Sequence, residues 1–209
     1  MEGDHPAPDP ARREQQQPGS QAGQQAEPQP EPRPELQQHT IVLIGLMGAG
    51  KTAVGRRLAT RLGLSFVDAD QEIEAAAGCS IADIFAMHGE QAFRDGERRV
   101  ISRLLDDPPH VLATGGGAWM DPETRAKVAE RSLSVWLRAD FEVLLRRTAR
   151  RSHRPLLRGR NHGEVLRKLQ EERYPVYALA DIVVDTEDCP LDTTVGRVLQ
   201  AIERYREPE

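Results

Sequence analysis

The 209-residue chain has a net charge of −5, of which −4 lies in residues 1–38, where seven acids accompany three arginines, so residues 39–209 are almost neutral. A near-neutral domain argues against general binding of nucleic acids or anionic membranes. No apolar run approaches the roughly 18 residues that cross a bilayer, and the acidic N-terminus resembles neither a secretory signal nor a transit peptide, so we expect a cytoplasmic protein.

The composition of residues 1–38 separates them from the remainder of the chain. They hold eight of the fifteen prolines, nine glutamines and no Ile, Val, Phe, Tyr or Trp. Such a segment buries too little apolar surface to offset the entropy lost on ordering. We predict a disordered tail over residues 1–38 and one domain over residues 39–209.

From residue 39 onward, short apolar runs alternate with amphipathic stretches. The runs predict strands at 40–44, 65–67, 110–114, 133–137 and 181–184. The stretches between and after them predict helices at 51–62, 90–105, 122–130, 140–151 and 193–205. This alternation is typical of an α/β fold, here a five-stranded parallel sheet with helices on both faces.

The stretch GLMGAGKT, residues 45–52, follows the first predicted strand and opens the first predicted helix. It fits the phosphate-loop pattern G-x-x-x-x-G-K-[ST] in the structural context that this motif requires. Its glycines let main-chain amides surround an anion, Lys51 can reach the outer phosphates, and the hydroxyl of Thr52 can bind magnesium.

A phosphate loop alone leaves the reaction open. A GTPase would carry an N-K-x-D-type motif, which is absent, and a motor ATPase would carry an acid after the strand that here runs into TGGGA. Two long connections, 70–109 and 151–180, have helical pattern without a strand. Because long excursions from a sheet are often binding segments or lids, we expect the acceptor substrate there.

Polar residues in these connections suggest an acceptor site. Asp68 and Asp70 follow the second strand, where one carboxylate could hold magnesium through a water and the other could orient an attacking hydroxyl. A helix cap at Asp70 would explain one of the two. Arg94 and Glu97 are three residues apart on one predicted helix, which for a bare pair indicates a solvated surface contact. The glycines of TGGGA allow a close main-chain approach to a ligand or a tight turn.

The segments GLMGAGKT, FVDADQEIE, SIADIF…GEQAFRDGE, TGGGA and RPLL, in this order and at these intervals, resemble the shikimate kinases over residues 40–205. The resemblance implies a P-loop kinase of the nucleoside-monophosphate-kinase type that moves a phosphoryl group from ATP, with Mg²⁺, to the 3-hydroxyl of shikimate. It also implies a helical substrate-binding excursion at about 70–109 and an arginine-rich lid at about 148–163.

Site residues follow from the same resemblance. Lys51, Asp70 and Arg154 are expected to be catalytic, and Thr52 with Asp68 to hold the metal. Substrate is expected at Asp70, Arg94, Gly116, Gly117 and Arg173, with both arginines on its carboxylate. The nucleotide is expected at Gly48, Ala49, Gly50, Lys51, Thr52, Ala53, Arg147 (against adenine) and Arg154 (on the phosphates). Chemistry agrees, because an acid with several hydroxyls needs arginine forks and a carboxylate acceptor.

Some features depart from this pattern or stay open. Residues 185–190 carry acids where related sequences often have a basic residue near adenine, so this loop departs from the family pattern. Trp119 is bulkier than expected, which we interpret as a packing variation. Residues 146–160 hold seven arginines and no acid, so a nucleic-acid patch is an alternative to the lid.

Other functions to weigh are a kinase for another polyol acid such as gluconate, and a nucleotide-binding module without turnover. We expect a monomer with reduced Cys79 and Cys189.

Overall fold

A computed structural model describes Met1 and residues 38–149 and 162–206 of the chain. Within them, five strands form one parallel sheet in the order β2-β3-β1-β4-β5. The strands are β1 (Thr40–Ile44), β2 (Ser65–Asp68), β3 (His110–Ala113), β4 (Ser132–Ala139) and β5 (Ile182–Thr186). The predicted five-stranded parallel sheet is therefore confirmed, and all five carboxyl ends meet at one edge.

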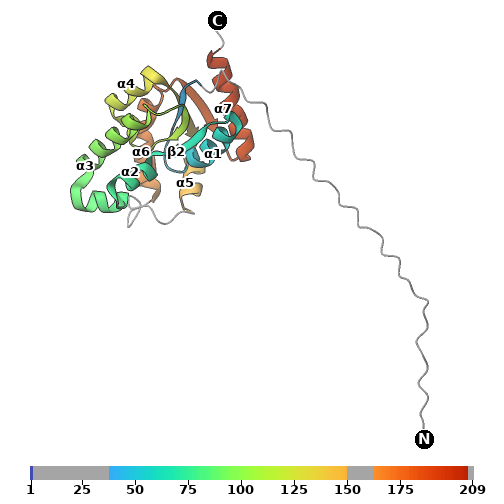
Figure 1. The fold of residues 1–209 in the computed structure, drawn as a ribbon, viewed down its shortest axis with the longest axis horizontal. Coiled ribbons are helices and arrows are strands. Elements are labelled where there is room, and N and C mark those ends of the chain that lie inside the picture. The colour runs from blue at the N-terminus through green and yellow to red at the C-terminus, as the bar shows by residue number, and fades with distance from the viewer. Residues whose placement is uncertain (2–37, 150–161, 207–209) are drawn as a thin grey trace.

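Helices cover both faces of the sheet (Figure 1). On one face α1 packs against α7, and on the other α3, α4 and α6 gather around the short 3₁₀ helix η2. The helices are α1 (Lys51–Leu62), α2 (Ala69–Ala77), α3 (Ile81–Leu104), α4 (Pro122–Arg131), α5 (Phe141–Ala149), α6 (His162–Tyr177) and α7 (Leu191–Arg206), and η2 is Ala118–Met120. Each strand is thus joined to the next by at least one helix, as parallel pairing requires.

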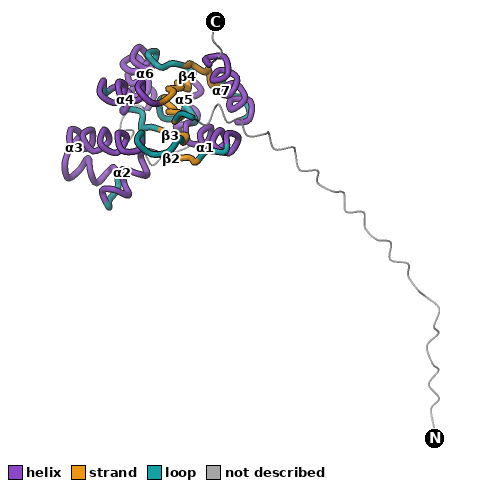
Figure 2. The backbone as a smooth tube through the Cα atoms, turned by 45° about the horizontal axis from the view of Figure 1, so that its top comes forward, coloured by secondary structure: helices purple, strands orange, loops and turns teal. Residues whose placement is uncertain are grey.

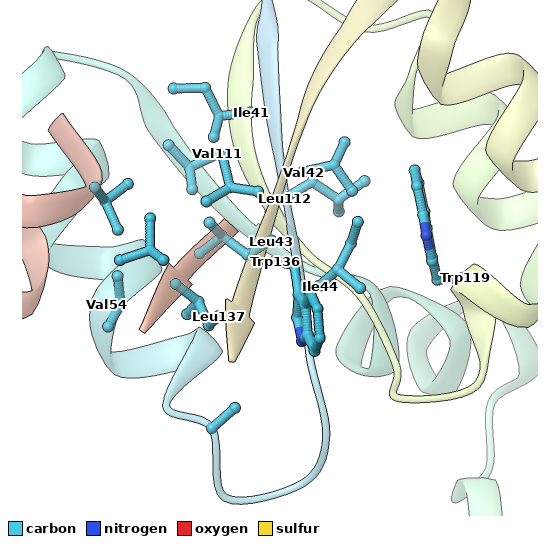
Figure 3. Packing of buried hydrophobic residues seen from close by; sticks show 14 of the residues in the cluster. Ile41, Val42, Leu43, Ile44, Val54, Val111, Leu112, Trp119, Trp136 and Leu137 are labelled. Carbon is cyan, nitrogen blue, oxygen red and sulfur yellow. The ribbon is translucent and has the colours of Figure 1, made fainter. Parts of the chain in front are cut away.

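The central strand β1 is buried on both faces, which explains its uninterrupted apolar sequence. Figure 3 shows Val42 and Ile44 on the side of Trp119, with Val54 of α1 on the opposite side. Leu43 and Ile44 are almost inaccessible to solvent. This double burial fixes the end of β1, and with it the start of the loop at residue 45.

The connection between β2 and β3 is the helical excursion that the sequence predicted. Figure 2 shows α2 and α3 together, on the far side of the molecule from α7. Ser80 begins α3 with a capping box, accepting from the Asp83 amide while Asp83 accepts from the Ser80 amide. Gly89 then interrupts α3 with a backbone that is not helical, φ 78° and ψ 177°. The helix predicted at 90–105 is the part of α3 that follows this interruption.

Boundaries differ from the predicted ones by a few residues. Strand β4 is three residues longer than 133–137, because Ser132, Arg138 and Ala139 also pair with its neighbours. Strand β5 begins one residue later and ends two residues later than predicted. Most of the proposed tail over residues 1–38 and most of the proposed lid lie outside the described residues.

Candidate active site

One cleft lies at the carboxyl ends of β1, β2 and β3. It has a volume of about 350 Å³. In the sheet, β1 lies between β3 and β4. The connection from β1 leads toward β2 on one side of β1, and the connection from β3 leads to β4 on the other side. Open parallel sheets bind ligands where the direction of the connections reverses in this way. The cleft is lined by residues of the phosphate loop, by both aspartates, by residues at the end of β3 and just after it, and by a residue of α5. These residues are Gly48, Gly50, Lys51, Thr52, Ala53, Asp68, Asp70, Ala113, Thr114, Gly116 and Arg147.

The phosphate loop presents the amino end of α1 to this cleft. Gly50 is the N-cap with φ 97°, a conformation that favours glycine, and it gives the helix no side-chain cap. The first turn of α1 contains no acid. Amides that lack a side-chain cap, together with the positive end of the helix dipole, attract an anion. The neighbouring Ala49 is buried.

Lys51 folds back over its own loop. Its Nζ donates to the main-chain carbonyls of Gly45 and Leu46 at 2.8 and 3.2 Å. The ammonium group therefore lies above the loop that would surround a phosphate. These contacts hold the cation at the cleft, which Lys51 lines.

Thr52 and Asp68 both line the cleft and contact one another. The Thr52 hydroxyl donates to Asp68 Oδ2 at 3.1 Å, so a hydroxyl and a carboxylate converge from α1 and β2. Oxygen donors of this kind suit Mg²⁺, which keeps several waters and takes few protein ligands. The other oxygen of Asp68 accepts from the Asp70 amide and caps α2. The cap of α2 is thus Asp68, and the interpretation of Asp70 as a helix cap is wrong.

Asp70 lies in the first turn of α2, beside the glycines that follow β3. A Cβ on Gly115 would lie 2.9 Å from Asp70 Oδ1 and 2.7 Å from Glu97 Oε1. Only a residue without a side chain fits between these two carboxylates. The first glycine of TGGGA is therefore required by a close approach inside the site.

On α3, the partly exposed Arg94 pairs with a buried Glu97. Arg94 Nη1 donates to Glu97 Oε2 at 2.7 Å, and the Glu97 side chain is only 4% exposed. The interpretation of this pair as a solvated surface contact is wrong for Glu97, whose side chain is buried and whose Oε1 lies close to Gly115. Burial raises the pKa of Glu97, Arg94 opposes the rise, and the charge of Asp70 adds to it. The pKa of Arg94 is also raised, because Glu97 and Glu90 outweigh the effect of burial.

Arg173 of α6 reaches the same glycine loop. Its Nη1 donates to the Gly116 carbonyl at 2.7 Å, and the hydroxyl of the fully buried Tyr177 donates to that carbonyl as well. A Cβ on Gly117 would lie 2.4 Å from Arg94 Nη1. Both predicted carboxylate anchors therefore contact adjacent glycines of a single loop.

Arg147 of α5 connects the phosphate loop with residues 185–190. Its guanidinium donates to the carbonyls of Gly48 at 3.4 Å and Glu187 at 2.9 Å. The acids of residues 185–190 pair with arginines outside the cleft, as Asp185 does with Arg138, Asp188 with Arg146 and Glu187 with Arg197. Their charge is thus compensated locally, and the loop offers its main chain to Arg147.

The remaining predictions for individual residues have varied outcomes. Arg154 lies outside the described residues. Trp119 is buried and its indole donates to the Val176 carbonyl at 3.1 Å, which supports a packing role. Cys79 and Cys189 are free thiols. In residues 38–149 and 162–206, no helix is long and apolar enough to cross a membrane.

Two residues of the site were missed from the sequence. Glu97 was noticed but interpreted as a surface residue, because spacing does not report burial. Tyr177 lies four residues after Arg173 on α6, which places both on one face of the helix, and this spacing could have indicated it.

Comparisons with known proteins agree with this geometry. The family model described as shikimate kinase matches residues 47–203. A shikimate kinase of Paramagnetospirillum magneticum is 59% identical over 170 residues, which is 81% of this chain and 87% of that protein. One from Caulobacter vibrioides is 60% identical over 167 residues, 80% of this chain and 84% of that protein.

Among solved structures, the shikimate kinase from Acinetobacter baumannii in complex with shikimate is similar with a TM-score of 0.77 at 38% identity. The similarity covers 81% of this chain and 96% of that one. A family model that spans most of the described domain, close relatives of matching length and the site geometry lead to one conclusion. The chain belongs to the shikimate kinase family.

Proposed function

We propose that this chain transfers the γ-phosphoryl group of ATP to the 3-hydroxyl of shikimate. The observation that carries the proposal is the single cleft that holds Lys51 and Asp70, with the glycine loop that contacts Arg94 and Arg173 at its side. A hydroxyl at Asp70 and a terminal phosphate at Lys51 would share this space. Transfer in line between them needs positioning and charge stabilisation more than covalent chemistry.

On the acceptor side, Asp70 would orient the attacking hydroxyl and take up its proton as the bond to phosphorus forms. The carboxylate of the substrate would lie between the guanidinium groups of Arg94 and Arg173, which bind planar anions with paired hydrogen bonds. The main chain of Gly116 and Gly117 would complete this end of the pocket. An acid bound at one end thereby directs one hydroxyl toward the phosphate loop.

On the nucleotide side, the amides of residues 48–53 would surround the phosphates. Lys51 would leave the carbonyls of its own loop and bind the outer phosphates. Arg147 would lie against adenine, held by the carbonyl of Glu187. We propose Thr52 and Asp68 as the residues that hold Mg²⁺, directly or through water. The ion supplies positive charge against the phosphates when it is bound.

Arg154 is proposed to close over the transferred charge as part of a lid at about 148–163. A cationic group at the transferring phosphoryl stabilises the transition state, and a closed lid keeps water from accepting the phosphate. Thr148 and His162, the described residues near the two ends of this segment, are 2.6 Å apart between Oγ1 and Nε2. The lid would thus begin and end at one point beside the phosphate loop.

A cytoplasmic location and a monomeric state, expected from the sequence, are also proposals. Within residues 38–149 and 162–206, the most exposed large apolar side chains are spread over different elements, among them Met87 on α3, Leu179 after α6 and Tyr205 on α7. Light scattering on the purified protein, with and without substrates, measures the oligomeric state directly.

The proposal is tested by measuring ADP release from purified protein with ATP and Mg²⁺, alone and with shikimate or gluconate. We expect release that depends on shikimate, with one phosphorylated product for each ADP. Release that ignores shikimate would contradict the substrate and the water-excluding lid. ADP release that depends on gluconate would favour a kinase for that polyol acid. Nucleotide binding without any ADP release would favour a non-catalytic module.

A further inference from the structure

The Gly116 carbonyl accepts two hydrogen bonds from α6. One comes from Arg173 Nη1 at 2.7 Å and the other from the Tyr177 hydroxyl. The Tyr177 side chain is fully buried, and burial raises the pKa of its hydroxyl, which therefore stays protonated and can donate. Gly116 itself lines the cleft. A buried phenol thus reaches the loop on which the proposed substrate anchors converge.

A buried tyrosine needs a hydrogen-bond partner wherever it lies, so the bond alone indicates only packing. The neighbouring Tyr174 provides the comparison. Both rings pack edge-on against Trp136, at centroid distances of 4.8 Å for Tyr174 and 5.9 Å for Tyr177. Both hydroxyls donate to a main-chain carbonyl, but Tyr174 bonds Ala139 at the end of β4, away from the glycine loop. Both rings pack against Trp136, with Tyr177 fully buried and Tyr174 partly buried, and only the Tyr177 hydroxyl bonds the glycine loop.

The shared carbonyl connects Tyr177 to the orientation of the substrate anchor. A guanidinium is planar, so one N–H fixed on a carbonyl restrains the plane of the whole fork. The peptide that carries the Gly116 carbonyl is planar too, so holding its oxygen also fixes the direction of the Gly117 N–H on its opposite edge. A glycine loop has little stiffness of its own. Loss of the Tyr177 bond would therefore loosen the loop and Arg173 together.

We propose that Tyr177 is a positioning residue for the acid end of the substrate, acting through the Gly116 carbonyl that it shares with Arg173. It does not touch the reacting atoms. Its hydroxyl holds the glycine loop and the Arg173 fork in the geometry that receives a carboxylate. The inference rests on the proposed function, because it takes Arg173 as the anchor of the substrate carboxylate.

The test compares Tyr177→Phe with Tyr174→Phe, since each removes one hydroxyl and keeps the ring. We expect Tyr177→Phe to raise the KM for shikimate about tenfold, a loss of ~1.4 kcal/mol in binding. Its KM for ATP should stay within about twofold of the unmodified enzyme, and Tyr174→Phe should leave both KM values unchanged within the same margin. Equal shikimate KM values for the two variants, at whatever thermal stability, would overturn the proposal.

A second measurement needs no substitution at Tyr177. The chain has three tyrosines, so protein labelled with 3-fluorotyrosine gives three ¹⁹F resonances, and Tyr174→Phe and Tyr205→Phe assign the third to Tyr177. On titration with shikimate alone, the Tyr177 resonance should shift while that of Tyr205 stays fixed. An unmoved Tyr177 resonance at saturating shikimate would count against the proposal even if the Phe variant did not fold.

The same data separate this inference from the proposed function. If the unmodified protein neither binds nor phosphorylates shikimate, the proposed function fails. If it does both, and Arg173→Ala raises the shikimate KM while Tyr177→Phe does not, only the role of Tyr177 fails.

Discussion

The two halves of the cleft are built differently. The phosphate side is a single stretch, residues 45–52, whose shape follows from its glycines and from its place between a buried strand and a helix. The proposed acceptor side is assembled from four separate segments: α2 supplies Asp70, α3 supplies Arg94 and Glu97, the loop after β3 supplies three glycines, and α6 supplies Arg173 and Tyr177. A local motif therefore faces a pocket that exists only in the folded chain.

This difference predicts how each half responds to damage. The phosphate side depends on main-chain amides, so only a few of its side chains carry chemistry. The acceptor side depends on side chains and on the contacts that hold them in place. Arg94 donates to Glu97, and Arg173 and Tyr177 both donate to the Gly116 carbonyl. Substitutions on the phosphate side should lower kcat, whereas supporting substitutions on the acceptor side should raise the KM for shikimate alone.

The largest effect is expected at Arg154, the proposed lid residue of the phosphate side. Arg154→Ala should lower kcat by ~10³ to 10⁵, or about 4 to 7 kcal/mol, because a cation at the transferring phosphoryl is lost. Thermal stability should change little, since an ion pair at a protein surface contributes at most about 1 kcal/mol. Steady-state kinetics and a thermal melt measure both, with Arg167→Ala on α6 as a control. A near-normal kcat would remove Arg154 from the mechanism.

The two aspartates after β2 divide between the halves. Asp70→Asn should lower kcat by ~10² to 10⁴ at saturating Mg²⁺, because an amide cannot accept the hydroxyl proton. Asp68→Asn should mainly raise the Mg²⁺ concentration that gives half-maximal rate, since its carboxylate lies beside the Thr52 hydroxyl. Titrations of Mg²⁺ on both variants distinguish them. Identical metal dependence would remove the distinction between the two carboxylates.

Gly117→Ala tests the close packing on the acceptor side. The new methyl group would lie 2.4 Å from Arg94 Nη1, so the guanidinium must move, and we expect the KM for shikimate to rise about tenfold, or ~1.4 kcal/mol. Gly96→Ala is the matched control on α3, where the added methyl group meets nothing within 4 Å. It should leave KM unchanged and stabilise the protein by about 0.5 to 1 kcal/mol. Equal KM values for both variants would contradict close packing at Gly117.

Glu97→Gln tests the cost of a buried carboxylate. The raised pKa of Glu97 means that the folded state binds its proton more tightly than the unfolded state does, so this group lowers stability as pH rises above about 4.3, its ordinary value. The free energy of unfolding of the variant, relative to the unmodified protein, should therefore increase from pH 4 to pH 7. Urea unfolding at several pH values measures it.

Asp192 provides the opposite sign for the same experiment. Arg57 and Arg61 lower the pKa of Asp192, so its contribution is present above about pH 3.9 and is lost as pH falls through the lowered value. Asp192→Asn should therefore have a lower free energy of unfolding than the unmodified protein at neutral pH, and this difference should vanish at acid pH. A difference for Glu97→Gln with the same sign as that for Asp192→Asn would show that Glu97 is stabilised as an anion.

The smallest effect is expected from removing the tail. A chain that begins near Gln37 should keep its kcat and both KM values within experimental error, because every residue proposed for the site lies beyond residue 44. Kinetics and a thermal melt on the truncated protein measure this. A loss of activity would mean that the tail takes part in the site or in its closure.

The sequence by itself determined the strand order along the chain, the parallel sheet and the phosphate loop. These features depend on local patterns, namely apolar runs of strand length, helical periodicity and glycines beside Lys51, and neighbouring residues carry all of that information. Resemblance to a family added the acceptor residues and their expected roles.

Only the tertiary structure decided that Glu97 is buried, that Asp68 and not Asp70 caps α2, and that Tyr177 and Arg173 share one carbonyl. Burial and shared partners depend on segments that are distant in sequence, since Gly116 is 57 residues from Arg173 and 61 from Tyr177. No local pattern around Glu97 differs from that of a surface ion pair. What covers a side chain is set by the packing of other elements, and that packing exists only once the chain has folded.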